Sequence, residues 1–335
     1  MTKKSGTSRR DFLKKCATGA AALRVAGKVT LLEAAAQTGP SQSRVVIARD
    51  AALRGAGTSV DSSRVLSMLD RSMQSLFGLD HPADPWKKLV RPGQTVGVKV
   101  NTLGGRGLST NVQLVDAICE RLQQAGIRAQ DIVVWDRETD EMERVGFHIS
   151  TADNRVQCFG TDRVGYEEKS ETYGSVDSRL SKILTQRCEV MINVPILKDH
   201  AGAGVTVAMK NMYGVIHNPN NLHSYGCNPY IADLNMLLAI KTKMRITICD
   251  ATTACYEGGP GFKPQYSWQH NALIVSQDPV ALDYTAWQII ERKRAENKLK
   301  TLEAAGRLPR YIATAADARH QLGTNDRRRI EVLEV

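Results

Sequence analysis

The sequence predicts an α/β protein whose mostly parallel sheet is covered by helices on both faces, as in a Rossmann-like three-layer sandwich. Short runs rich in valine and isoleucine alternate along the chain with longer segments of helical periodicity. Strands that are apolar throughout are typical of parallel sheets, because helices bury both faces of such a sheet. Hydrophobic residues make up 42% of the 335 residues, which is enough for one sizeable core.

The elements follow one another without an obvious domain boundary. Seven segments have the composition of strands: 44–48, 95–100, 131–136, 155–160, 188–197, 244–250 and 271–278. Four segments have apolar residues at the three- and four-residue spacing of a helix: 62–78, 111–126, 228–241 and 279–294. We therefore expect residues 44–335 to form a single α/β domain that follows a short linker at 37–43.

The first 36 residues differ from the rest of the chain. The segment 8–14, SRRDFLK, resembles the twin-arginine export motif, and a stretch of small residues follows it. We expect residues 1–36 to be a signal peptide that is cleaved near Ala34-Ala35-Ala36. The protein would then be periplasmic or secreted, with the twin-arginine translocase as a partner. A basic leader without an export function is the alternative.

Composition excludes several other classes of protein. The formal net charge is +10, but residues 1–36 hold eight Lys or Arg and two Asp or Glu. The 37 basic and 33 acidic residues beyond them leave a net charge of +4, which gives no support to a nucleic-acid partner. No apolar run is long enough for a conventional membrane span, so none is expected after cleavage.

The seven cysteines form no C-x-x-C pair, so the chain has no ferredoxin-type iron–sulfur motif. Four of them lie in apolar segments and are expected in the core: Cys119, Cys158, Cys188 and Cys249. Cys227 and Cys255 lie in predicted loops, and the sequence leaves it open whether they form a disulfide.

Polar residues gather where the predicted strands end. The ends carry Lys99 and Asn101, Asp136, Lys198-Asp199-His200, Asp250 and Asp278. Ligands of open α/β sheets bind outside the carboxyl ends of the strands. We therefore expect Lys99, Lys198, Asp250 and Asp278 to lie at one edge of one sheet.

These residue types favour an anion site. Lys99, Lys198 and Lys210 together would bind a carboxylate or a phosphate, and crowding would lower the pKa of one lysine enough to make it a base or nucleophile. The predicted catalytic residues are His200, Lys210 and Lys198. The predicted substrate-binding residues are Lys99, Asn101, Asn211, Gly204 and Thr206. Asp250, Glu257, Asp278 and His223 are candidate ligands for a divalent metal.

Several of the polar residues in these segments also have a purely structural interpretation. Asp136 and Asp278 are each suited to cap the helix that follows. His217 and His223 fit surface positions in a loop. Lys99, in contrast, lies within an apolar strand, where a charged side chain requires either a partner or a ligand.

The same residues give the chain its resemblance to a known family. The segments "VGVKVN", "NVPILKDH" followed by "VAMKNMYG", "ICDATTACYEGGPG" and "SQDPVALD" resemble the family called domain of unknown function 362, over about residues 90–320. The resemblance implies a shared pocket rather than a particular reaction. It implies these signature positions: Lys99, Asn101, Lys198, His200, Lys210, Asn211, Gly214, His223, Asp250, Glu257, Gly258, Pro260, Asp278 and Asp283.

Three functions remain open at this point. The first is an exported enzyme that acts on a small anionic substrate, with the reaction class unassigned. The second is an anion-binding protein without catalysis. The third is a metal- or redox-cofactor protein that uses His200, His217, His223 and the carboxylates, with Cys255 as a further ligand.

Overall fold

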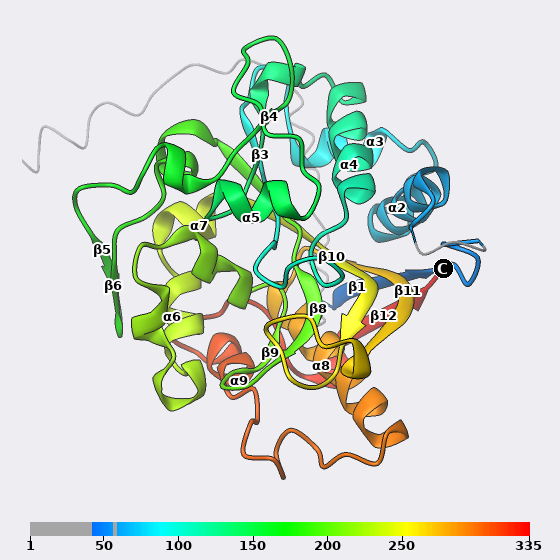
Figure 1. Cartoon of the computed structure of the whole chain (residues 1–335), viewed down its shortest axis with the longest axis vertical. Coiled ribbons are helices and arrows are strands. Elements are labelled where there is room, and N and C mark those ends of the chain that lie inside the picture. The colour runs from blue at the N-terminus through cyan, green and yellow to red at the C-terminus, as the bar shows by residue number, and fades with distance from the viewer. Residues whose placement is uncertain (1–41, 56–58) are drawn as a thin grey trace, which may run out of the picture. The chain divides into compact units, whose positions relative to one another are not determined.

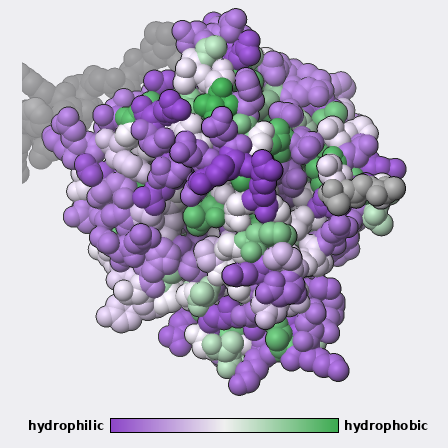
Figure 2. All heavy atoms as spheres, viewed as in Figure 1, coloured by the Kyte–Doolittle hydropathy of each residue, from purple (hydrophilic) through white to green (hydrophobic). Residues whose placement is uncertain are grey.

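The computed structural model describes residues 42–55 and 59–335, all of which belong to one compact unit (Figure 1). The twin-arginine segment, the predicted cleavage site and most of the linker lie outside the described residues. Within the described ranges, no helix is long and apolar enough to cross a membrane. The face in Figure 2 is mostly hydrophilic, with apolar residues scattered over it.

A ten-stranded sheet forms the centre of the fold. Its main order is β12 (Ile330–Glu334), β1 (Ser43–Arg49), β11 (Ser267–Ser276), β10 (Met244–Cys255), β7 (Val190–Asn193), β2 (Val96–Lys99), β3 (Ile132–Trp135) and β4 (Gln157–Cys158). β8 (Ile196–His200) pairs with β10 and β9 (Gly204–Thr206). Only β11 and β9 run against the other strands of this sheet.

Helices cover both faces of the sheet, which confirms the predicted α/β fold (Figure 1). One apolar cluster joins α2 (Ser62–Phe77), α3 (Asp84–Leu89) and α4 (Val112–Gln124) to the sheet. The other joins α6 (Tyr230–Asn235), α7 (Leu238–Lys243), α8 (Pro279–Glu296) and α9 (Tyr311–Ala316) to it. Alternate residues of one strand enter different clusters, with Val134 in the first and Trp135 in the second. This alternation explains why the strands are apolar throughout.

Short elements complete the described chain. α5 (Thr139–Arg144) follows β3, and a hairpin of β5 (Glu171–Tyr173) and β6 (Val176–Ser178) stands apart from the main sheet. Two 3₁₀ helices, η4 (Lys210–Val215) and η5 (Pro219–Leu222), come between β9 and α6. Six cysteines in the described ranges are buried and free, including Cys227 and Cys255.

Two predicted elements are each divided in the structure. The expected strand 188–197 consists of β7 and β8, and Pro195 lies in the break because proline cannot donate a backbone hydrogen bond to a sheet. The expected helix 228–241 consists of α6 and α7, with Leu237 between them in an extended conformation (φ −54°, ψ 133°). The break after β7 lets β8 bring Lys198 and His200 to the edge of the sheet.

The prediction that Asp278 joins the other strand ends is wrong. β11 is antiparallel to β10, with Ser276 opposite Thr247, so the end of β11 lies at the amino end of its neighbours. Asp278 instead caps α8, where its side chain accepts hydrogen bonds from the backbone N–H groups of Val280 and Ala281. The structural interpretation of this residue is therefore the correct one.

Candidate functional site

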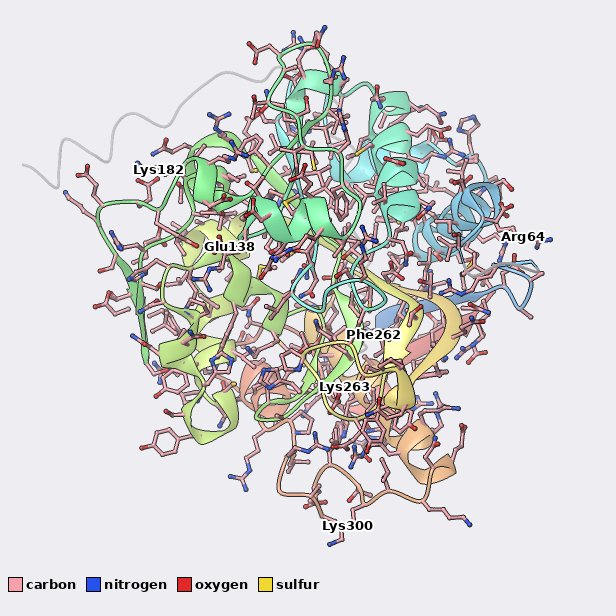
Figure 3. The ribbon with its side chains drawn as sticks, viewed as in Figure 1. Arg64, Glu138, Lys182, Phe262, Lys263 and Lys300 are labelled. Atoms are coloured by element: carbon pink, nitrogen blue, oxygen red, sulfur yellow. The ribbon has the colours of Figure 1, made fainter. Side chains whose placement is uncertain are left out.

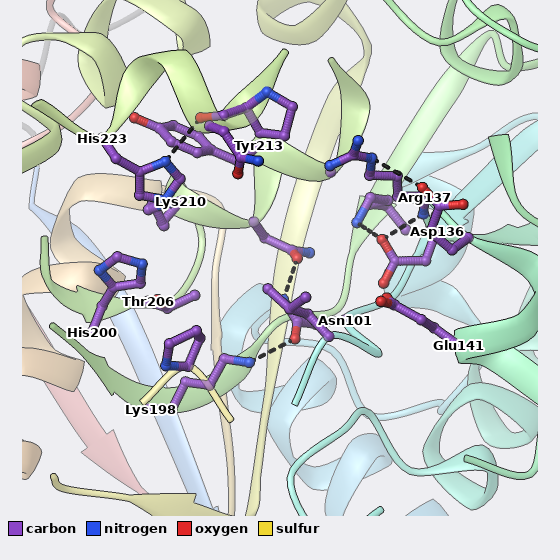
Figure 4. Close-up of a pocket in the computed structure, with 18 residues that line it drawn as sticks. Asn101, Asp136, Arg137, Glu141, Lys198, His200, Thr206, Lys210, Tyr213 and His223 are labelled. Carbon is purple, nitrogen blue, oxygen red and sulfur yellow. Dashed lines mark hydrogen bonds and ion pairs between the residues drawn. The ribbon is translucent and has the colours of Figure 1, made fainter. Parts of the chain in front are cut away.

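A cavity of about 460 Å³ opens at the carboxyl ends of the parallel strands (Figure 4). This volume lies within the roughly 300–1,000 Å³ that small-molecule sites occupy. The structure places eight of the predicted site residues around it: Lys99, Asn101, Lys198, His200, Thr206, Lys210, Asn211 and His223. Gly204, Asp250, Glu257 and Asp278 do not line it.

Lys99 is buried and already has a carboxylate partner. Its Nζ lies 2.7 Å from Asp136 Oδ1 and donates a second hydrogen bond to the Val100 carbonyl at 2.8 Å. Asp136 also accepts hydrogen bonds from the backbone N–H and the hydroxyl of Thr102. The prediction that Asp136 caps the next helix is wrong, because Glu138 is the residue before α5. Lys99 therefore holds the loop after β2 to the loop after β3, and its charge is neutralised.

Lys198 is also buried, but it has no carboxylate partner among the described residues. Its Nζ donates to Asn101 Oδ1 at 3.0 Å. Asn101 Nδ2 donates to Asn211 Oδ1 at 2.9 Å, and Asn211 Nδ2 donates to Asn193 Oδ1 at 2.7 Å. This chain of amides fixes the side-chain orientation of each asparagine and holds the ammonium group at the cavity. Burial lowers the pKa of Lys198 to about 8, so the lysine is mostly charged at neutral pH.

Lys210 lies in a more apolar setting. Its Nζ is 3.4 Å from the centre of the Tyr213 ring and 3.2 Å from His223 Nε2. His223 Nδ1 donates to the Pro219 carbonyl at 2.9 Å, so the other ring nitrogen accepts the hydrogen bond from Lys210. Burial, together with the charge of Lys198, lowers the pKa of Lys210 to about 7. At neutral pH this amine is close to half protonated.

A buried carboxylate positions the segment that carries Lys210. Asp283 of α8 accepts hydrogen bonds from the backbone N–H groups of Ala208 and Met209 at 2.7 and 3.3 Å. Tyr311 donates a third hydrogen bond to the same carboxylate at 3.0 Å. Burial raises the pKa of Asp283 to about 7. The family resemblance implies that Asp283 is a signature position. Asp283 does not line the cavity but holds the backbone that precedes Lys210.

His200 is a neutral hydrogen-bond donor. Its Nδ1 accepts the backbone N–H groups of Gly202 and Ala203, each at 3.0 Å, so the network assigns the proton to Nε2. Burial, and then the charge of Lys210, lowers the pKa of His200 to about 3. The ring also stacks on His223 with centroids 5.5 Å apart.

Thr206 and Gly204 lie on β9 but differ in their surroundings. The Thr206 hydroxyl is buried without a hydrogen-bond partner among the described residues, and the residue lines the cavity opposite Lys198 in the β8–β9 pair. Gly204 has a φ of +81°, and a Cβ there would lie 2.3 Å from the Arg307 carbonyl oxygen. Backbone conformation and packing thus account for Gly204 without a substrate.

The predicted metal ligands are not brought together. Asp250 accepts hydrogen bonds from Asn111 and Thr252, and Glu257 forms ion pairs with Arg294 and Arg307. His217 is hydrogen-bonded to Ser178 and Arg179, away from the cavity. Within residues 42–55 and 59–335, no three His, Cys, Asp or Glu side chains are grouped to hold a metal ion. Cys255 hydrogen-bonds to the Glu257 carbonyl and does not line the cavity.

Two loops form part of the mouth of the cavity. Leu103, from the loop after β2, and Pro260, from the loop after β10, both line it. Phe262 in the second loop donates its backbone N–H to the Gly104 carbonyl at 3.1 Å (Figure 3). Leu103 is 60% exposed, so it presents apolar surface beside the opening.

The sequence did not single out several residues that line the cavity. Arg137, Glu138 and Glu141 lie in or just before α5, and Tyr213 lies in η4. Arg137 and Glu138 directly follow Asp136 at the end of β3, and this position after a strand end is the sequence feature that indicates them. Glu141 and Arg144 are ordinary charged residues of a short helix, and their sequence pattern does not distinguish the one that faces the cavity.

The fold and the cavity define an α/β protein with a polar small-molecule pocket at the carboxyl edge of its sheet. The chain belongs to the family described as Domain of unknown function (DUF362), whose model matches residues 96–288, more than half of the chain. The predicted family resemblance is thereby confirmed over residues 96–288, a shorter range than the expected 90–320.

A crystal structure of a protein from Thermotoga maritima is similar to the chain at 10% sequence identity, with a TM-score of 0.40. The match covers 72% of this chain and 60% of that protein. A comparison with curated proteins gave no match.

Proposed function

We propose that the protein is an enzyme that acts on a small carboxylate or phosphate compound in this cavity. The observation that carries the proposal is the presence of two buried lysines, Lys198 and Lys210, that have no carboxylate partner among the described residues and line one cavity. Burying a charge without an opposite charge is costly, and an anionic ligand would relieve that cost.

The two lysines are suited to different tasks. Lys198 is mostly charged at neutral pH, and Asn101 fixes its ammonium group, so it would bind the anion. Lys210 has a pKa near neutrality, which is what a group that accepts and returns a proton requires. The Nε2–H of His200 and the hydroxyl of Thr206 would donate hydrogen bonds to the same substrate.

Anion binding is the first test of this proposal. At pH 7 and constant ionic strength, sulfate and succinate are expected to bind and to raise the melting temperature more than chloride does. Lys198→Met should weaken binding by about 30-fold or more, because removing one member of a buried charge pair typically costs about 2–5 kcal/mol. Sulfate affinity should also fall as pH rises through 7 and 8, where Lys210 and then Lys198 lose their protons.

Isothermal titration calorimetry measures these affinities, and Lys88→Met is the matched control. Lys88 is exposed on α3 and forms no ion pair within the described ranges, so its loss should leave sulfate binding unchanged. Equal affinities in wild type and Lys198→Met, or no binding of either anion to the wild type, would contradict the proposed site.

A non-catalytic anion-binding protein is the second candidate, and it is favoured by the amide chain that fixes Lys198 in place. NMR can follow a panel of small carboxylates and phosphate esters for turnover. An enzyme should convert at least one of them and should lose that activity, but not all binding, in Lys210→Met. Binding throughout the panel without turnover would favour the second candidate.

We further propose that the protein is exported by the twin-arginine route. Replacing Arg9 and Arg10 together with lysine is expected to retain the precursor in the cytoplasm, because the motif requires the arginine pair. Fractionation and immunoblotting measure the processed protein in the periplasm. The double change Lys3→Arg and Lys4→Arg, outside the motif, is the control. An undiminished amount of processed periplasmic protein in the Arg9 and Arg10 variant would contradict this route.

A further inference from the structure

The charges that line the cavity do not all cancel locally. Lys99 and Asp136 form a buried ion pair at 2.7 Å. Arg137 and Glu138 form a second ion pair at 3.2 Å, and both of its side chains are more exposed than those of the first pair. Each of these four side chains therefore has an opposite charge beside it, and none of them requires a charged ligand.

Three charged groups remain after these pairs are set aside: Lys198, Lys210 and Glu141. Within the described ranges, Glu141 forms no hydrogen bond or ion pair of its own. Its side chain lies beside that of Asp136 in Figure 4. Partial burial and then the negative charges of Asp136 and Glu138 raise its pKa, and the more weakly acting charges of Arg144 and Arg137 only partly offset that rise. Glu141 attracts the Lys198 ammonium electrostatically, yet the two groups are not within ion-pair distance.

The unpaired charges come from different parts of the fold. Lys198 and Lys210 belong to β8 and η4, whereas Glu141 belongs to α5. In Figure 4, Asn101 lies between Lys198 and the Asp136–Glu141 side of the cavity. The cavity thus has a basic side and an acidic side, and a ligand that fills it meets both.

We infer that the ligand of this cavity carries a cationic group as well as an anionic one, with the anion at Lys198 and Lys210 and the cation at Glu141. This inference rests on the proposed function, because it assigns the anion to the same two lysines. It adds the class of substrate: a compact zwitterion, such as an amino acid with its two charges separated along the molecule.

Electrostatics disfavours a dianion that spans the cavity. A second negative group on the acidic side would approach Glu141, Asp136 and Glu138, of which only the last two form ion pairs. Arg144 and Arg137 attract Glu141 only from beyond ion-pair distance. Like charges repel strongly at a site that is partly closed to water. A cationic group in the same place gains a charge-assisted hydrogen bond to Glu141. The acidic side therefore acts as a specificity determinant.

Matched pairs of ligands test this inference by calorimetry at pH 7. β-Alanine is compared with propionate, γ-aminobutyrate with butyrate, and δ-aminovalerate with valerate. At least one amino acid should bind the wild type about ten-fold more tightly than its partner, the size expected for one well-placed charge pair. That advantage should disappear in Glu141→Gln and persist in Glu143→Gln, which alters an exposed glutamate of the same helix.

The outcomes separate this inference from the proposed function. Alkanoates that bind as tightly as the amino acids would overturn the zwitterion and leave the anion site intact. An amino-acid advantage that survives Glu141→Gln would likewise overturn the role of Glu141. If none of these ligands binds, and sulfate does not bind either, both the anion site and the zwitterion would be overturned.

Discussion

Replacing Lys99 with methionine is expected to lower the free energy of unfolding by about 3–5 kcal/mol. Lys99 is fully buried, and its ammonium group is the cation that neutralises buried Asp136. Methionine keeps the apolar stem but leaves the carboxylate without its counter-charge. Urea denaturation at pH 7, followed by circular dichroism, measures the loss.

A second variant separates the ion pair from simple packing. Adding Asp136→Asn to Lys99→Met should recover a large part of the lost stability. The amide removes the unpaired charge while its oxygen can still accept the hydrogen bonds from Thr102. A single Lys99→Met change that costs no more than Lys88→Met would instead mean that Lys99 is free to bind a ligand.

Much of the fold follows from strand composition, but strand direction does not. The apolar runs located the strands, and their two-sided burial correctly indicated helices on both faces. The direction of β11 was missed because composition does not encode it. The connection between β10 and β11, residues 256–266, contains no α-helix, whereas parallel strands are usually joined through one. The sequence feature that indicates an antiparallel neighbour, and hence the true place of Asp278, is the lack of any predicted helix between the expected strands 244–250 and 271–278.

The candidate site was predictable in its basic part for a physical reason. A lysine is rarely buried in an apolar strand without a partner or a ligand, so the sequence predicts Lys99 and Lys198 as site residues. The sequence could not show that Lys99 is paired and Lys198 is not, because the difference depends on Asp136 arriving from the next strand in the sheet. Glu141 carries no comparable signal, since acidic residues on short helices are usually exposed to solvent. The acidic side of the cavity is therefore known only from the structure.

Replacing Lys210 with methionine is expected to have the opposite effect to the change at Lys99. The folded state lowers the pKa of Lys210 from 10.5 to about 7, so the buried lysine costs stability wherever the unfolded chain holds it protonated. Each pKa unit corresponds to about 1.4 kcal/mol, and the contact with Tyr213 offsets about 0.5–2 kcal/mol of the total. In an anion-free buffer, Lys210→Met should therefore be more stable than the wild type by a few kcal/mol.

The pH dependence of that difference identifies its cause. Below pH 7 the lysine is protonated in both states, and the full cost is present. Between pH 7 and pH 10.5 the lysine is neutral in the folded protein but still protonated in the unfolded chain. The free energy that Lys210 costs the folded state therefore falls as pH rises, and the stability difference between Lys210→Met and the wild type becomes smaller. Urea denaturation between pH 6 and pH 9 measures this trend, with Lys88→Met as the pH-independent control.

Saturating sulfate should stabilise the wild type more than Lys210→Met, because the Lys210 ammonium group that destabilises the anion-free protein also binds the anion. A loss of stability in anion-free Lys210→Met at pH 7 would contradict this account and assign Lys210 a structural role.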